Sequence, residues 1–73
     1  MNTQLLASQA DDNVAEAHSL FDSGQGESSP DNIAALAHWT VALYLHHVCG
    51  CRPPGNPPPG AAGWPTTWEE VQA

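Results

Sequence analysis

The chain has 73 residues with eight acidic side chains, one arginine and no lysine, giving a net charge of −7 at pH 7. A chain of this length forms at most one small domain, which buries only about 60% of its unfolded surface, so its own core is marginal. The negative charge argues against direct nucleic-acid binding and against anionic membrane surfaces. Basic protein surfaces are the partners that it would attract.

Residues 3–22 have the apolar spacing of an amphipathic helix. One predicted face carries Leu6, Ala7, Ala10, Val14, Ala17 and Phe21, and the other carries Ser8, Asp12, Glu16, Ser19 and Ser23. Leu5 and Leu20 lie off this stripe. A polar, glycine-rich connection over 23–28 follows, and its length is usual between antiparallel helices.

Residues 30–49 form the predicted helix with the clearest ends. Ser29 is a preferred N-cap, Pro30 suits the first helical position, and Asp31 complements the helix dipole. Gly50 suits the left-handed residue that often ends a helix. Both ends of this helix are therefore predicted from specific residues.

This second helix has almost no polar face. Between Ile33 and Gly50 it carries no charged side chain, and its apolar residues are spread around the whole circumference. Such a helix is expected to be buried on all sides, with Leu43 in the buried seam. Because the rest of the chain is too small to cover it, we expect burial against another chain, in a homodimer resembling a four-helix bundle or in a complex with a larger partner.

The C-terminal third contains no long helix. Residues 51–65 are rich in Pro and Gly, which predicts an extended strap with turns near Pro54 and Gly60. Residues 66–73 predict a short helical turn, in which Thr66 would be the N-cap of a capping box. The expected fold class is therefore all-α, with a two-helix antiparallel hairpin within 1–50, the strap and the turn in one domain.

The only cluster with metal-ligand chemistry in the sequence runs from His46 to Cys51, with His38 two turns earlier. Zinc binds thiolate and imidazole, but C-x-C is tighter than the usual C-x₂₋₄-C spacing. Since His46 and His47 point about 100° apart on a helix, both do not easily serve one site, and the candidate set is His47, Cys49 and Cys51. The alternative is two histidines beside a buried cysteine with no metal. We expect no cofactor and no enzyme activity. Catalysis by Cys and His needs a positioned pair of these residues and an oxyanion site, and two helices offer few ways to form both.

Six of the eight acids precede the second helix, with no basic residue among them: Asp11, Asp12, Glu16, Asp22, Glu27 and Asp31. One interpretation is a solvated face. The other is an anionic surface that imitates nucleic acid or docks on a basic groove of another protein.

These patterns favour a small acidic, non-enzymatic protein-interaction module that binds a host protein or itself. Its sharper form is a stoichiometric inhibitor or adaptor of phage or mobile-element type. The expected partner-binding residues are aromatic, apolar and acidic: Trp39, Leu43, Tyr44, Trp64, Trp68, Asp11, Asp12 and Glu16. The alternatives are an assembly component of a larger particle and a small zinc-binding protein.

A cytoplasmic location is the expectation, for two reasons. The N-terminus lacks a basic stretch followed by a long apolar one, so no signal peptide is visible. Two cysteines one residue apart do not make a disulfide framework. The apolar stretch of the second helix is about 17 residues long without basic anchors, whereas a span needs roughly 20, so no membrane segment is expected.

Overall fold

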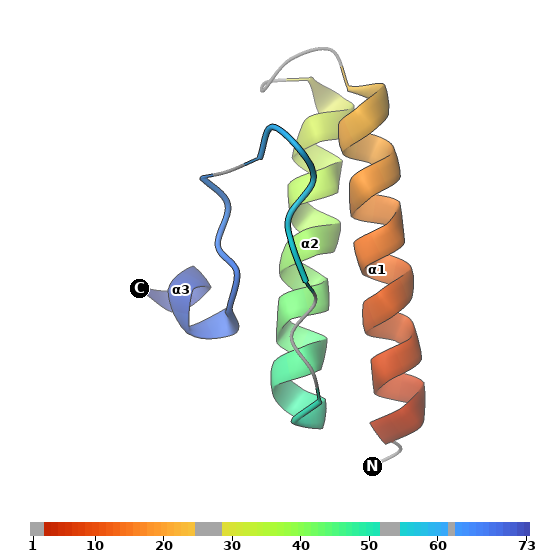
Figure 1. Ribbon diagram of the computed structural model, residues 1–73, viewed down its shortest axis with the longest axis vertical. Helices are drawn as coiled ribbons and strands as arrows, with labels where there is room; N and C mark the ends of the chain where they lie inside the picture. The colour runs from red at the N-terminus through yellow and green to blue at the C-terminus, as the bar shows by residue number, and fades with distance from the viewer. Residues whose placement is uncertain (1–2, 25–28, 52–54, 62) are drawn as a thin grey trace.

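The computed structural model shows two long antiparallel helices, an extended segment that runs back along them and a short third helix (Figure 1). The structure describes residues 3–24, 29–51, 55–61 and 63–73. The helices are α1 (Thr3–Ser23), α2 (Pro30–Cys49) and α3 (Trp68–Gln72). The all-α class and the helical hairpin predicted from the sequence are confirmed. Glu27, Arg52 and Pro54 lie outside the described residues.

Both ends of α2 are fixed by the predicted cap residues. The Ser29 hydroxyl accepts a hydrogen bond from the Asn32 backbone N–H at 3.1 Å, which satisfies one of the free donors of the first turn. At the other end, Gly50 has φ 67° and donates its N–H to the carbonyls of His46 and His47. The left-handed residue that glycine permits thus closes the helix.

The hairpin is held by a narrow seam of small and large apolar residues. Ala10 and Ala17 of α1 are fully buried, and on α2 the fully buried residues include Ala35 and Trp39. Small side chains let the two helices approach closely, while Trp39 fills the space beside them. Leu43 is 2% exposed, so its predicted place in the buried seam is confirmed.

The described part of the strap runs along α2, in front of it in Figure 1. The Trp39 indole N–H donates to the Pro65 carbonyl oxygen at 2.7 Å. Trp64 packs edge-on against Phe21, with ring centroids 5.3 Å apart. Gly60, with φ 93°, provides the predicted turn. The described part of the strap is thus packed on the helices within a single chain.

The N-cap of the short third helix lies one residue later than predicted. Thr67, and not Thr66, is the N-cap, because its hydroxyl accepts the Glu70 N–H at 3.1 Å. The Glu70 carboxylate in turn accepts from the Thr66 hydroxyl and backbone N–H. The hydroxyl half of a capping box is therefore present at Thr67 and Glu70, one position after the predicted Thr66–Glu69 pair, while the Glu70 carboxylate bonds Thr66, the residue before the cap.

A polar contact fixes the hairpin at mid-length. His38 of α2 lies 2.9 Å from the side-chain oxygen of Asn13 of α1, measured from Nδ1. Asn13 uses its amide nitrogen to donate to the Gln9 carbonyl at 2.8 Å. The amide oxygen therefore accepts and His38 Nδ1 donates. This pair satisfies polar groups between the helices and favours one register of α1 against α2.

Candidate functional site

α2 is buried on one side only. The side opposite its buried seam carries most of its exposed apolar side chains, around the half-buried Thr40, and we call this side the α2 outer face: Ile33, Leu36, Ala37, Val41 and Tyr44. Exposed fractions are 62% for Ile33, 45% for Val41 and 47% for Tyr44. This exposed side is the apolar surface that the rest of the chain was expected to be too small to cover, and its burial against another chain stays a prediction. Within the described residues, no helix has the length and hydropathy needed to cross a bilayer.

The α2 outer face continues into a hollow at its N-terminal end. A cavity of about 380 Å³ opens between α2 and the strap, lined by Ile33 and Leu36 on one side and by Trp64 and Gly60 on the other, with Phe21 at its base. Concave, mostly apolar hollows are where a partner's anchor side chain is most readily buried. The face therefore offers both a row of apolar side chains and a recess.

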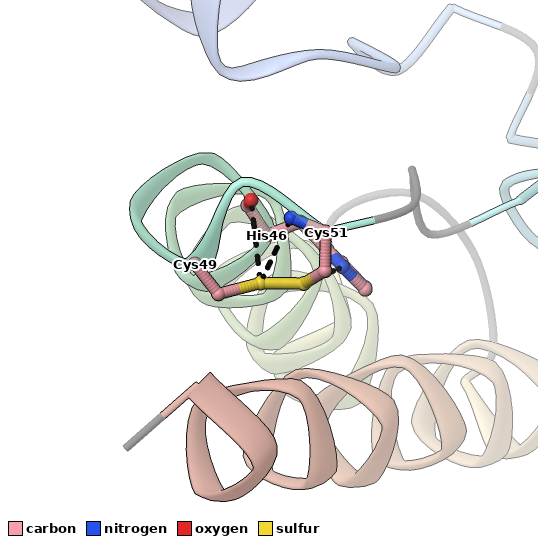
Figure 2. The surroundings of a disulfide bond; sticks show 3 residues. All are labelled: His46, Cys49 and Cys51. Atoms are coloured by element: carbon pink, nitrogen blue, oxygen red, sulfur yellow. Dashed lines mark hydrogen bonds between the residues drawn. A yellow bond between two sulfur atoms is a disulfide. The ribbon is translucent and has the colours of Figure 1, made fainter. Parts of the chain in front are cut away.

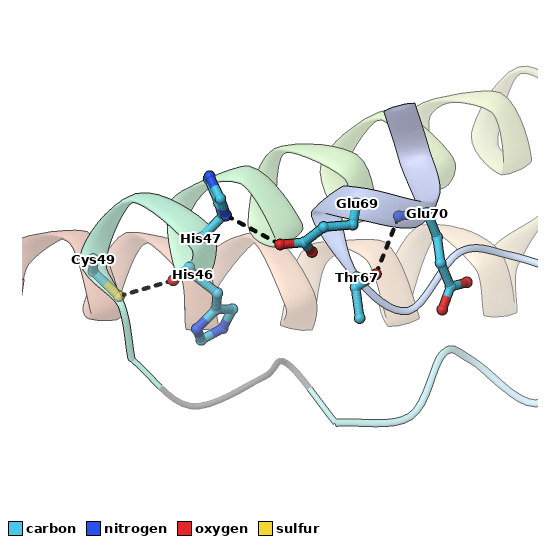
Figure 3. Close-up of polar contacts among 6 residues, drawn as sticks. All are labelled: His46, His47, Cys49, Thr67, Glu69 and Glu70. Atoms are coloured by element: carbon cyan, nitrogen blue, oxygen red, sulfur yellow. Dashed lines mark hydrogen bonds and ion pairs between the residues drawn. The ribbon is translucent and has the colours of Figure 1, made fainter. Parts of the chain in front are cut away.

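At its C-terminal end the face is bordered by α3. The Tyr44 and Trp68 rings meet edge-on with centroids 5.0 Å apart. Beside them, His47 Nδ1 lies 3.6 Å from the Glu69 carboxylate (Figure 3). Both of these side chains are well exposed, so this ion pair contributes little stability even when the histidine is charged. α3 thus adds an aromatic ring and acidic groups to this end of the face.

The residues predicted to bind a partner are divided by the fold. Trp39 and Leu43 lie in the core, so a partner does not reach them while the chain is folded. Trp64 packs against that core and is half-buried. Tyr44 and Trp68 lie together at the C-terminal end of the α2 outer face.

The acidic candidates lie elsewhere. Asp11, Asp12 and Glu16 are exposed on α1 and take no part in the α2 outer face. Four members of that face were not among the predicted binding residues: Ile33, Leu36, Ala37 and Val41. Their helical spacing was visible in the sequence, but the sequence does not say which side of an all-apolar helix the hairpin leaves open.

A second candidate site lies at the end of α2. The two cysteines of the chain, Cys49 and Cys51, are joined in a disulfide, and the His46 ring lies beside it with Nδ1 3.3 Å from Cys51 Sγ (Figure 2). The ligand atoms of these three residues lie within 4.8 Å of one another. His46 is 5% exposed. The structure thus groups an imidazole and two sulfurs at one point.

His47, the histidine of the predicted metal set, is not part of this group. Its ring faces Glu69 of α3, on a different side of α2 from His46 (Figure 3). The reason is the helical rotation of about 100° per residue, which places only one of two adjacent histidines on the side where the sulfurs lie. His46 therefore replaces His47 in the candidate set.

The disulfide itself is a weak structural device. It joins residues two positions apart, and closing so short a ring removes little chain entropy, about 1.6 kcal/mol against about 3 kcal/mol for a 15-residue loop. Its two sulfurs are relevant here as metal ligands.

A cavity of about 270 Å³ adjoins the disulfide, lined by His46, Cys51, Thr66, Trp68 and Glu69 among others.

Comparisons of this chain with protein-family models, with curated proteins and with solved structures found no match. We therefore argue its function from the two sites themselves. The α2 outer face has the form of a docking surface, and the cluster of His46, Cys49 and Cys51 has the donor atoms of a metal site.

Proposed function

We propose that this chain is a non-enzymatic protein-interaction module that docks through the α2 outer face. The proposed partner is a protein whose surface offers an apolar groove edged by Lys and Arg side chains. The observation that supports this is one row of large exposed apolar side chains on a helix with no charged residue between Asp31 and its end. Monomeric soluble proteins rarely expose a contiguous apolar patch of this kind unless it binds something.

The spacing of the face matches a common mode of recognition. Ile33, Leu36, Ala37, Val41 and Tyr44 follow positions i, i+3, i+4, i+8 and i+11 of one helix. An amphipathic helix that lies in an apolar groove uses anchors at such positions. Fully burying a large apolar side chain contributes about 1.5–3 kcal/mol, and part of that gain remains to be made at Ile33, Val41 and Tyr44, which are still partly exposed.

The charge distribution favours a basic partner over a second copy. Glu69 and Glu70 lie in α3, beside the C-terminal end of the α2 outer face, whereas Asp31 at the start of α2 accepts a hydrogen bond from Ser23 of α1. Two copies that paired through this face would each bring a net charge of −7. A groove edged by Lys and Arg would instead meet the acidic groups of α3, and the opposite charge of the two proteins would accelerate encounter. Such a module would act as a stoichiometric inhibitor or an adaptor, because both act by binding alone and need no catalytic group.

The test uses a defined probe and the intact chain. The probe is a helical peptide with leucines on one face and flanking lysines, and the matched control has glutamate for every lysine. Backbone amide shifts are recorded by NMR during titration, and the mass of the free chain is measured by sedimentation. We expect a monomer and a lysine peptide that shifts mainly residues of the α2 outer face, with much weaker binding of the glutamate peptide.

Three results would overturn the proposal. Shifts that centre on α1 would place the binding surface elsewhere. Equal binding of the two peptides would remove the charge argument. A free chain that is dimeric, and that dissociates when Tyr44 is changed to Lys, would make a second copy the occupant of the α2 outer face.

A further inference from the structure

Independently of the α2 outer face, we propose that the reduced chain binds one Zn²⁺ through His46 Nδ1 and the thiolates of Cys49 and Cys51. The fourth position of the ion would be open to the adjoining cavity and filled by water. The proposal rests on the arrangement of these three side chains at the end of α2 (Figure 2).

The local backbone brings the two sulfurs together. Cys49 is the last residue of α2, and Gly50 reverses the chain with its left-handed conformation. The Cα atoms of Cys49 and Cys51 consequently lie 5.3 Å apart, with both sulfurs beside the His46 ring. The Cys51 backbone N–H also donates to Cys49 Sγ at 3.2 Å. A backbone donor of this kind stabilises the negative charge of a thiolate.

The histidine already lies at a coordinating distance. With Zn–S near 2.3 Å and Zn–N near 2.0–2.1 Å, two ligand atoms of a tetrahedral ion lie about 3.6 Å apart. The observed separation of His46 Nδ1 and Cys51 Sγ is 3.3 Å. Once the disulfide is opened, the two sulfurs must move apart to the separation that a tetrahedral ion requires. Because His46 is almost fully buried, its ring is held in place before the metal arrives.

The donor set selects the metal. Thiolate and imidazole favour zinc over the hard cations magnesium and calcium, which prefer oxygen. Two cysteines and one histidine with an open fourth position are a known ligand set for zinc. The cavity of about 270 Å³, with Thr66 and Glu69 in its lining, leaves room for a bound water.

The disulfide and the zinc site exclude each other. In the disulfide each sulfur is bonded to the other, so neither offers the thiolate that zinc requires. Zinc binding is therefore a property of the dithiol form alone. The same two cysteines give the chain two chemically distinct states at the end of α2.

The test begins with the chain reduced by a phosphine and kept free of oxygen. Co²⁺ serves as the spectroscopic probe, because its thiolate complexes absorb strongly in the near ultraviolet and its tetrahedral complexes absorb in the visible. We expect one equivalent of Co²⁺ to develop both bands and one equivalent of Zn²⁺ to abolish them. The oxidised chain should develop neither.

Three variants distinguish the proposed metal ligands from a neighbouring histidine. Substitution of a residue that only hydrogen-bonds a metal ligand lowers metal affinity roughly 10–100-fold. Cys51→Ser and His46→Gln, which remove a ligand, should each lower the metal affinity by more than that. His47→Gln is the matched control and should bind as tightly as the parent chain. Far-ultraviolet circular dichroism checks that each variant is folded, and if His46→Gln unfolds, Cys49→Ser takes its place as the second ligand variant.

Several results would overturn the proposal. They are a Co²⁺ spectrum without the thiolate band, equal metal affinity of the ligand variants and the His47→Gln control, and metal binding by the oxidised chain. Binding of Cu⁺ with no binding of Zn²⁺ would contradict it as well.

Discussion

The Trp39 indole donates a 2.7 Å hydrogen bond to the carbonyl oxygen of Pro65, 26 positions further along the chain. This bond fastens the strap to the buried seam of the hairpin, because Trp39 is fully buried between α1 and α2. Trp64, next to Pro65, packs on the same ring with centroids 6.3 Å apart. The end of the strap therefore packs on the core, although the described strap residues form no helix or strand.

Replacing Trp39 by Phe should measure that bond. Phe keeps an aromatic ring but removes the N–H, so the Pro65 carbonyl loses its donor and some core volume is lost. We expect the free energy of unfolding to fall by about 2–4 kcal/mol, as measured by denaturant titration. Tyr44→Phe, which changes only an exposed hydroxyl, is the control and should stay within about 0.5 kcal/mol of the parent. An equal loss in both variants would contradict the role given to Trp39.

An aspartate at position 43 should unfold the chain. Leu43 is 2% exposed in the seam between the helices, where an unpaired carboxylate is strongly disfavoured. We expect Leu43→Asp to lose its cooperative thermal transition. Leu5→Asp is the matched control at a position that is 54% exposed, and its thermal midpoint should change by only a few degrees. A folded Leu43→Asp would show that the seam is not the core.

Replacing glycine by alanine should change the free energy of unfolding in opposite directions at two positions. Gly50 has φ 67°, so Gly50→Ala is strained although no atom lies within 4 Å of the added methyl group. We expect a loss of about 1 kcal/mol. Gly63 has equally open space and lies outside the left-handed region, so Gly63→Ala should be neutral or slightly stabilising. The free energies of unfolding of the two variants compare them directly.

Reversing two charges on α1 tests whether α1 contributes to peptide binding by long-range electrostatic attraction or by direct contact. Asp12 and Glu16 are exposed and one turn apart on α1, away from the α2 outer face. The double variant Asp12→Lys, Glu16→Lys should fold normally. It should weaken binding of the lysine peptide only a few-fold at low salt, with the difference disappearing at high salt. Complete loss of binding at any salt would place α1 in the contact surface.

Local signals in the sequence predicted the elements well. Ser29 and Gly50 marked the ends of α2 because capping depends on the backbone needs of single residues. The stripe containing Ala10 and Ala17 predicted the buried face of α1 because it depends only on helical periodicity. The third helix was displaced by one residue, since Thr66 and Thr67 are both competent caps and the position of Glu70 decides between them.

The sites were harder to predict because they depend on contacts between elements. α2 is apolar all round, so its composition does not show which side α1 and the strap cover. For the same reason, the predicted metal ligands differ from the cluster in the structure at one residue, with His47 in place of His46. Which of these histidines faces the sulfurs depends on the path of the chain after Gly50 and on where α3 packs.

The most direct test of the proposed docking function compares two lysine substitutions that change charge equally. Val41→Lys lies in the α2 outer face, and Ala15→Lys lies on the exposed side of α1. The dissociation constant of the lysine-flanked peptide is measured by calorimetry for both variants and for the parent chain. The proposal predicts at least tenfold weaker binding for Val41→Lys and nearly parental binding for Ala15→Lys. Equal affinities for the two variants would contradict it.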